Sequence, residues 1–164
     1  MIKNVKPIFV VLVFSSLISL SFNERSTSTE KLALGDKAPK LVIGDNKQAL
    51  NLQNPATDYT LLSFWASYDA VSRMENAKMD HLLKNSARVK MVSISFDSYQ
   101  SVYQAAIKQD GVETSNCHWE MEGEDSYLFK SFDLKGGFKN YLLDKDGVIV
   151  AKDLTADDLV SYLN

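Results

Sequence analysis

Hydrophobic residues form two nearly continuous runs of strand length in the middle of the chain. The first run is DYTLLSFWAS at 58–67 and the second is RVKMVSISFD at 88–97. Runs of this kind are typical of strands that are buried on both faces of a sheet. Between them, residues 69–85 have helical spacing, with an expected buried stripe of Val71, Met74, Met79, Leu82 and Leu83. The order strand, helix, strand predicts two parallel strands joined by a right-handed crossover.

A second helix is predicted over residues 98–111. Ser98 is its candidate N-cap and Gly111 its stop. Its expected buried stripe consists of Val102, Ala105, Ala106 and Ile107. A short strand at CHWEM (117–121) and a short helix or turn at DSYLFKSFD (125–133) follow. The helix should therefore lead back to one more strand of the sheet.

Two hairpins are predicted, one near each end of the chain. In the first, two short apolar patches flank Gly44-Asp45-Asn46, and in the second, two apolar runs flank the turn 144–147. The chain closes with a capping box, Thr155 to Asp158, and an amphipathic helix. The whole pattern predicts an α/β fold: a three-layer α/β/α sandwich with a mixed central sheet and an N-terminal β-hairpin.

The first residues are typical of a secretory signal. Lys3 and Lys6 precede an apolar run over about 8–20, and small residues allow cleavage before Phe22. An uncleaved membrane anchor is the alternative, although a spanning helix needs about 20 apolar residues. We therefore expect residues 1–21 to be a signal peptide, 22–34 a flexible lead-in and 35–164 the folded domain. The protein should be exported and soluble, and periplasmic if its source is a Gram-negative bacterium.

The charge balance argues against one class of partner, and the cysteine content excludes an internal disulfide. The chain has 18 basic and 21 acidic residues, and removing 1–21 leaves 16 and 21, a formal charge of −5. This balance argues against a nucleic-acid partner, which requires a basic face. Cys117 is the single cysteine, so the chain has no internal disulfide.

Several motifs in order resemble the exported TlpA/ResA-like thiol–disulfide oxidoreductases, which have the thioredoxin fold. They are LGDKAP (34–39), LLSFWAS (61–67), Arg73 with Glu75, SISFD (93–97) and YLLDKDGVIVAK (141–152). The resemblance covers roughly 35–164 and implies a redox site directly after the strand at 58–67.

The chain differs from the family at the positions that carry the family's redox chemistry. Asp69 and Ser72 stand at the positions of the two cysteines of the CxxC motif, and Phe138 stands at the position of a cis-proline. Dithiol exchange requires a thiolate and a resolving thiol, so the family's usual reaction is lost at this place. We expect Asp69 to be a helix cap, Ser72 a first-turn residue and the bond before Phe138 to be trans.

Weaker candidates for a functional site are Trp65, Tyr68, Cys117 and the acidic run at 120–126. Trp65 continues a buried strand and is expected in the core, whereas Tyr68 could belong to either the core or a binding groove. Cys117 lies beside His118, and either a buried, idle thiol or a reactive one fits this position. The acids in 120–126 lack the spacing of a calcium loop. No metal and no cofactor are expected.

The functional hypothesis is an exported thioredoxin-like domain without the dithiol site, acting as a non-catalytic binding or interaction protein. It would hold a peptide or protein partner of unknown identity with Tyr68, Asp69 and Phe138. The alternative is a thiol oxidoreductase in cell redox homeostasis that acts through Cys117 and a partner thiol. A structural domain of an envelope assembly is a third hypothesis. Membrane contact is expected only through an uncleaved signal.

Overall fold

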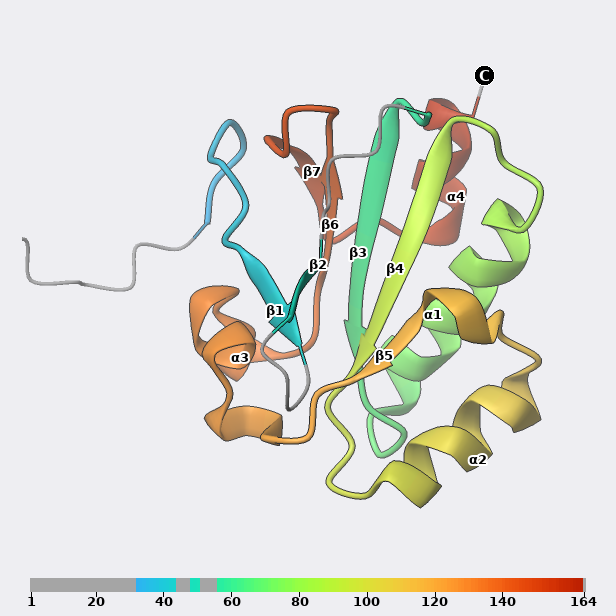
Figure 1. The fold of residues 1–164 in the computed structure, drawn as a ribbon. Coiled ribbons are helices and arrows are strands. Elements are labelled where there is room, and N and C mark those ends of the chain that lie inside the picture. Colours follow the sequence, from blue (N-terminus) through green and yellow to red (C-terminus); the bar gives the residue numbers. More distant parts are fainter. Residues whose placement is uncertain (1–31, 44–47, 51–55, 164) are drawn as a thin grey trace, which may run out of the picture. The chain divides into compact units, whose positions relative to one another are not determined.

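A five-stranded mixed sheet, with strand order β5-β4-β3-β6-β7, forms the centre of the fold (Figure 1). The computed structural model describes residues 32–43, 48–50 and 56–163. The parallel strands are β3 (Tyr59–Trp65), β4 (Val89–Ser95) and β5 (Cys117–Trp119). The antiparallel strands are β6 (Asn140–Leu143) and β7 (Ile149–Lys152). The predicted parallel pair and the C-terminal hairpin are confirmed.

Helices and a small hairpin cover the two faces of this sheet (Figure 1). One face carries α1 (Ala70–Leu83), α2 (Gln100–Asp110) and α4 (Ala156–Leu159). The other face carries α3 (Tyr127–Ser131) and the antiparallel hairpin of β1 (Leu41–Ile43) and β2 (Gln48–Leu50). The predicted three-layer α/β architecture and N-terminal hairpin are confirmed, while the turn at 44–47 lies outside the described residues.

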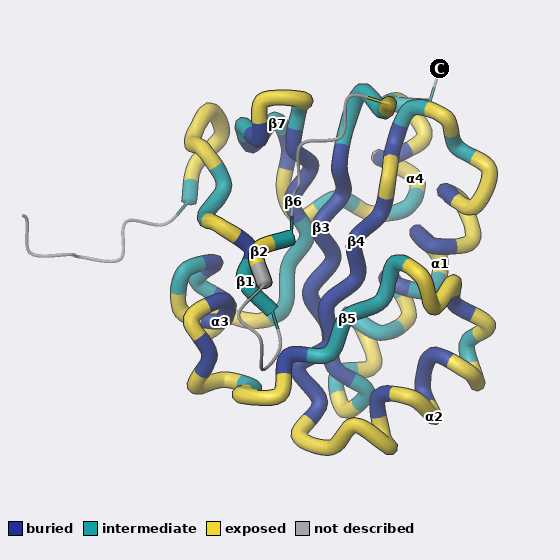
Figure 2. The backbone as a smooth tube through the Cα atoms, in the orientation of Figure 1, coloured by how far each residue is buried: buried dark blue, intermediate teal, exposed yellow. Residues whose placement is uncertain are grey.

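Side chains of β3 alternate between two core regions. Leu62 and Phe64 pack with Phe132 on the face that carries α3 and the β1–β2 hairpin. Leu61 packs with α1 and α4, and Trp65 packs with α2. Successive strand residues point to opposite faces, and both faces are covered here. β3 and β4 are consequently buried along almost their whole length (Figure 2).

The predicted stripe of α1 is wrong at three positions. Val71, Met74 and Leu82 are exposed, and the buried residues are Asn76, Met79, Asp80 and Leu83. The two buried polar side chains are satisfied, because Ser93 Oγ donates to Asn76 Oδ1 and the Glu113 backbone N–H donates to Asp80 Oδ2. A stripe chosen from apolar residues alone does not detect such partners.

The start of α2 also differs from the prediction. Tyr99, not Ser98, is the N-cap residue, and no side chain caps this end. Tyr103, Ala106 and Ile107 form the buried face, whereas Val102 and Ala105 are exposed. Gly111 ends the helix with φ 65°, as predicted, because glycine adopts this left-handed conformation without steric cost.

The N-terminal cap of the last α-helix, α4, was predicted correctly. Thr155 Oγ1 accepts a hydrogen bond from the Asp158 backbone N–H at 3.2 Å, and Asp158 Oδ2 accepts one from the Thr155 backbone N–H at 2.9 Å. This reciprocal pair is the expected capping box of α4.

Residues just before the predicted domain start pack onto the fold. Leu32 contacts the core on the hairpin side, and its carbonyl oxygen accepts a hydrogen bond from Lys152 Nζ at 3.2 Å. The expected signal peptide and its cleavage site lie outside the described residues. In the part of the chain that the structure describes, no helix has the length and apolar character needed to cross a membrane.

Candidate functional site

The turn from β3 into α1 contains Asp69 and Ser72, the two residues expected at the cysteine positions. This turn and the neighbouring Phe138 are here called the corner. Asp69 is the N-cap of α1, and its Oδ1 accepts a hydrogen bond from the Ser72 backbone N–H at 2.9 Å. Ser72 lies in the first turn, and its Oγ donates to the Asp69 carbonyl oxygen at 3.2 Å. The predicted capping role of Asp69 is confirmed, and both side chains contribute to the start of the helix.

Asp97 anchors this corner and was missed by the sequence analysis. It follows β4 and is only 1% exposed. Its Oδ1 accepts from the backbone N–H of Ser67 at 2.9 Å and from Ser67 Oγ at 2.6 Å, and its Oδ2 accepts from Ser95 Oγ at 2.8 Å. A buried carboxylate with several donors holds the loop rigidly against the neighbouring strand. The available signal was an acidic residue directly after a buried strand.

Trp65 belongs to the core, as predicted. It is 1% exposed, and its Nε1–H donates to Ser93 Oγ at 2.8 Å. The Ser93 hydroxyl donates in turn to Asn76 Oδ1 at 2.8 Å. These bonds connect β3, β4 and α1 behind the corner, so Trp65 positions the corner and does not line its surface.

Tyr68 and Phe138 lie together at the surface of the corner. Tyr68 is 62% exposed, and its ring centroid lies 6.1 Å from that of Phe138. Phe138 is partly buried: its ring stacks on Phe96 at 5.8 Å and meets the ring of Phe129 at 6.4 Å. The structure therefore brings together the predicted set Tyr68, Asp69 and Phe138, and supports the exposed tyrosine from behind.

The peptide bond before Phe138 is trans, as expected, since the described residues contain no cis bond. The ring of Phe138 belongs to an aromatic cluster with Phe96 and Phe129. An aromatic side chain at this point buries much more apolar surface than a proline ring would.

Electrostatically, the corner is acidic. Partial burial raises the pKa of Tyr68, and the nearby carboxylates of Glu124, Asp97 and Asp69 raise it further. Negative charge disfavours the tyrosinate, so the phenol stays protonated and available as a hydrogen-bond donor at neutral pH.

A groove of about 480 Å³ begins at this corner and follows α1. Arg73 closes it against α2, because its Nε and Nη2 donate to the two carboxylate oxygens of Asp110, each at 2.7 Å. The residues that line the groove are Ser67, Ala70, Arg73, Met74, Ala77, Lys78, His81 and Asp110.

Cys117 is not part of this corner. It pairs with Ser93 in the sheet and packs against the cluster of Trp65 and Tyr103 on the α1–α2 face. Its thiol donates to the Glu113 carbonyl oxygen at 3.3 Å, and burial raises the pKa of Cys117 to about 11. Phe138, by contrast, packs into the core on the opposite face of the sheet. The raised pKa favours the neutral thiol at physiological pH, and the sheet separates the thiol from Phe138.

Acidic residues after β5 do not form a metal centre in the structure. Gly123–Asp125 is a 3-10 turn, and Glu120 accepts a hydrogen bond from the Glu122 backbone N–H at 3.1 Å. Within residues 32–43, 48–50 and 56–163, no three His, Cys, Asp or Glu side chains come together in a way that could hold a metal ion.

No family model matches the chain, and no curated protein does either. Among solved structures, a thioredoxin-like protein from Parabacteroides distasonis ATCC 8503 is 35% identical, with a TM-score of 0.72 over 81% of this chain and 96% of that chain. The thioredoxin domain of a thiol-disulfide oxidoreductase from Bacteroides vulgatus is 25% identical, with a TM-score of 0.64 over 82% of this chain and 100% of that chain. A thiol-disulfide oxidoreductase from Bacteroides fragilis NCTC 9343 is 26% identical, with a TM-score of 0.63 over 77% of this chain and 96% of that chain.

These similarities extend over most of this chain and almost all of each matched chain. The identity to the Parabacteroides distasonis protein extends over almost all of that protein. The chain belongs to the thioredoxin-like family of thiol–disulfide oxidoreductases, and its single cysteine fits the loss of a CxxC motif.

Proposed function

We propose that this protein is an exported, non-catalytic member of its family that binds a polypeptide segment at the corner formed by Tyr68, Asp69 and Phe138. The observation that carries the proposal is the hydrogen-bonded pair of Asp69 and Ser72 at the former dithiol positions. The fold and the corner are preserved, while the groups that exchange electrons are replaced by groups that cap a helix.

Dithiol exchange at this corner has no chemical basis. A thiolate must attack a disulfide sulfur, and a second thiol must then displace the mixed disulfide. A carboxylate and a hydroxyl cannot form or resolve such a bond. The Asp69 carboxylate is moreover engaged by the Ser72 backbone N–H at 2.9 Å.

The properties of Cys117 argue against the alternative of a single-thiol oxidoreductase. Only the thiolate is an effective nucleophile. With its pKa raised to about 11, Cys117 has very little thiolate at neutral pH, and its side chain packs beneath α2.

Binding is supported by the construction of the corner. The exposed ring of Tyr68 rests on Phe138, which is itself held by Phe96, and Asp97 fixes the loop before Tyr68. A rigid aromatic side chain loses little conformational entropy on binding, and such residues dominate interface energies.

Export is proposed from the basic start and apolar run of residues 1–21. N-terminal sequencing of the protein from its native host should give a first residue near Phe22. An intact Met1 on membrane-bound protein would replace this part of the proposal with the uncleaved anchor.

Two measurements test the function itself. In an insulin-reduction assay with dithiothreitol, the protein should be no faster than the blank. Peptides selected on the protein from a random display library should lose affinity for Tyr68→Ala and Phe138→Leu. Leu34→Ala is the matched control, because Leu34 is 61% exposed and lies near Ile149, at the opposite end of the sheet.

Faster insulin reduction that Cys117→Ser abolishes would overturn the proposal in favour of thiol chemistry. Equal loss of peptide affinity in Tyr68→Ala and Leu34→Ala would show that binding does not use this corner. Failure to select any peptide would also count against it.

A further inference from the structure

Large apolar side chains gather at the carboxyl end of the parallel strands. Seven of the ten exposed large apolar side chains among the described residues lie in the loops and first two helical turns that follow β3, β4 and β5. Val102 and Tyr127 are two of them, and the other five have exposed fractions from 48% to 70%. These five residues, here called the apolar rim, are Tyr68, Val71, Met74, Tyr99 and Met121. Such a concentration marks an interaction surface more often than scattered exposed residues do.

Hydrogen bonds hold the three loops of the rim together. The loop after β3 is tied to the end of β4 by the Ser67 and Asp97 bonds. The end of β5 is tied to the same point, because Trp119 Nε1–H donates to the Asp97 carbonyl oxygen at 2.7 Å. The Glu120 backbone N–H also donates to the Ser95 carbonyl oxygen at 2.9 Å. The rim is thus a preorganised surface and does not consist of independent loop tips.

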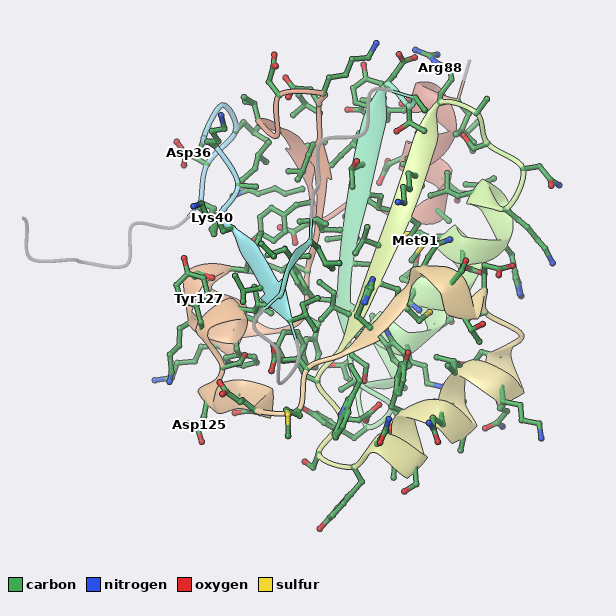
Figure 3. The ribbon with its side chains drawn as sticks, in the orientation of Figure 1. Asp36, Lys40, Arg88, Met91, Asp125 and Tyr127 are labelled. Atoms are coloured by element: carbon green, nitrogen blue, oxygen red, sulfur yellow. The ribbon has the colours of Figure 1, made fainter. Side chains whose placement is uncertain are left out.

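Exposed acids border one side of the rim. Glu122, Glu124 and Asp125 surround the 3-10 turn next to Met121, and Figure 3 shows Asp125 and Tyr127 projecting outward beside α3. Glu124 lies close enough to Tyr68 to act on its phenol, as does Asp69. These side chains make this part of the surface negative.

Nearby cations are already engaged within the fold. Arg73 forms its bidentate pair with Asp110. Lys139 Nζ lies 3.9 Å from Asp133, and Lys130 Nζ donates to the Asp125 carbonyl oxygen. The acids at Glu122 and Glu124 have no salt bridge among the described residues.

We infer that the partner held at the apolar rim is a polypeptide segment in which apolar side chains are flanked by basic residues, with the basic residues over Glu122 and Glu124. This inference rests on the proposed function and specifies the chemistry of its partner. Charge complementarity carries it: apolar side chains would cover the rim, and lysine or arginine would supply the counter-charges that the fold itself does not provide.

The negative charge of this surface also argues against two other binding partners, a second copy of the chain and an anionic lipid surface. If a second copy of the chain bound with its own rim on this surface, it would bring the same acids against Glu122 and Glu124, and these like charges would repel each other. The formal charge of the full chain, −3, adds to this repulsion. An anionic lipid surface would be repelled by the same carboxylates.

The test uses the full chain and three fluorescent peptides that share one set of apolar residues and differ only in their flanking residues, which are Lys, Gln or Glu. The Lys peptide should bind about fivefold more tightly than the Gln peptide at low salt. This preference should shrink as the salt concentration rises from about 50 mM to about 500 mM.

The double variant Glu122→Lys with Glu124→Lys should abolish the preference for the Lys peptide. Asp146→Lys is the matched control: Asp146 is exposed in the β6–β7 turn, at the other end of the sheet, and should leave the preference unchanged.

If the peptides bind equally and Tyr68→Ala weakens all three, the charge inference is wrong and the proposed function stands. If none binds, or if Tyr68→Ala has no effect, both fail. Tighter binding of the Glu peptide, or a shift to dimers on sedimentation, would point to a different partner and overturn the inference.

Discussion

Asp69 and Ser72 are joined by two hydrogen bonds across the first turn of α1. The Asp69 carboxylate accepts from the Ser72 backbone N–H at 2.9 Å, and the Ser72 hydroxyl donates to the Asp69 carbonyl oxygen at 3.2 Å. At the two positions where the resemblance implies the thiols, the side chains therefore form a helix cap and its partner.

Removing the cap should destabilise the protein. Asp69→Ala should lower the free energy of unfolding by about 0.5–2 kcal/mol, because the Ser72 backbone N–H loses its acceptor. Asp69→Asn should cost less, since the amide oxygen still caps the helix and only the attraction to the helix dipole is lost. Urea unfolding followed by circular dichroism measures both, with Asp146→Ala as an exposed control. Equal losses in Asp69→Ala and Asp146→Ala would refute the capping role.

Restoring the two cysteines tests the position of the corner. In a Cys117→Ser background, Asp69→Cys with Ser72→Cys should form an intramolecular disulfide, because side chains three residues apart on a helix are neighbours. The helix N-terminus should lower the pKa of the first thiol and confer weak insulin reduction. Thiol titration before and after oxidation measures pairing. Cysteines that remain free under oxidising conditions would contradict the geometry.

Cys117 should react slowly with iodoacetamide near neutral pH. Burial raises its pKa to about 11, so the thiolate fraction in the folded protein becomes large only in strongly alkaline solution. Mass spectrometry of alkylation against pH should show a later rise for the folded chain than for the chain in guanidinium. Coincident profiles would mean that the thiol is accessible and unperturbed.

Phe138 should contribute to stability as well as to binding. Its ring packs against Phe96, Phe129 and Tyr68, so Phe138→Ala should cost about 2 kcal/mol of unfolding free energy. Phe138→Leu should cost less, because leucine refills part of the space. Thermal unfolding checks both variants. A neutral Phe138→Ala would show that the aromatic cluster does not support the corner.

His118 should make the fold sensitive to mild acid. Burial, together with Lys90, lowers the pKa of His118 below its ordinary value of 6.5. Above that value the residue is neutral in both states; as the pH falls below it, the unfolded chain binds the proton first and stability is lost. Comparing urea midpoints at about pH 7.5 and about pH 5.5, His118→Gln should lose less stability than the native chain. An equal loss in both proteins would contradict this assignment.

The sequence by itself determined the features that depend on short stretches of chain. The runs at 58–67 and 88–97 became the buried parallel strands β3 and β4, since continuous apolar character identifies a strand covered on both faces. Asp69, Gly111 and the pair Thr155–Asp158 end or begin helices as predicted. A cap or a turn involves atoms within about four residues, so its chemistry is readable from local spacing.

Only the tertiary structure decided which faces are buried and which distant groups meet. The buried face of α1 includes Asn76 and Asp80 because Ser93 and the Glu113 backbone supply their hydrogen-bond partners from other elements. Asp97 anchors the corner through residues about 30 positions away, as the Ser67 bonds show. Burial, packing partners and pKa depend on atoms that are close in space and distant along the chain, and hydrophobic periodicity does not contain that information.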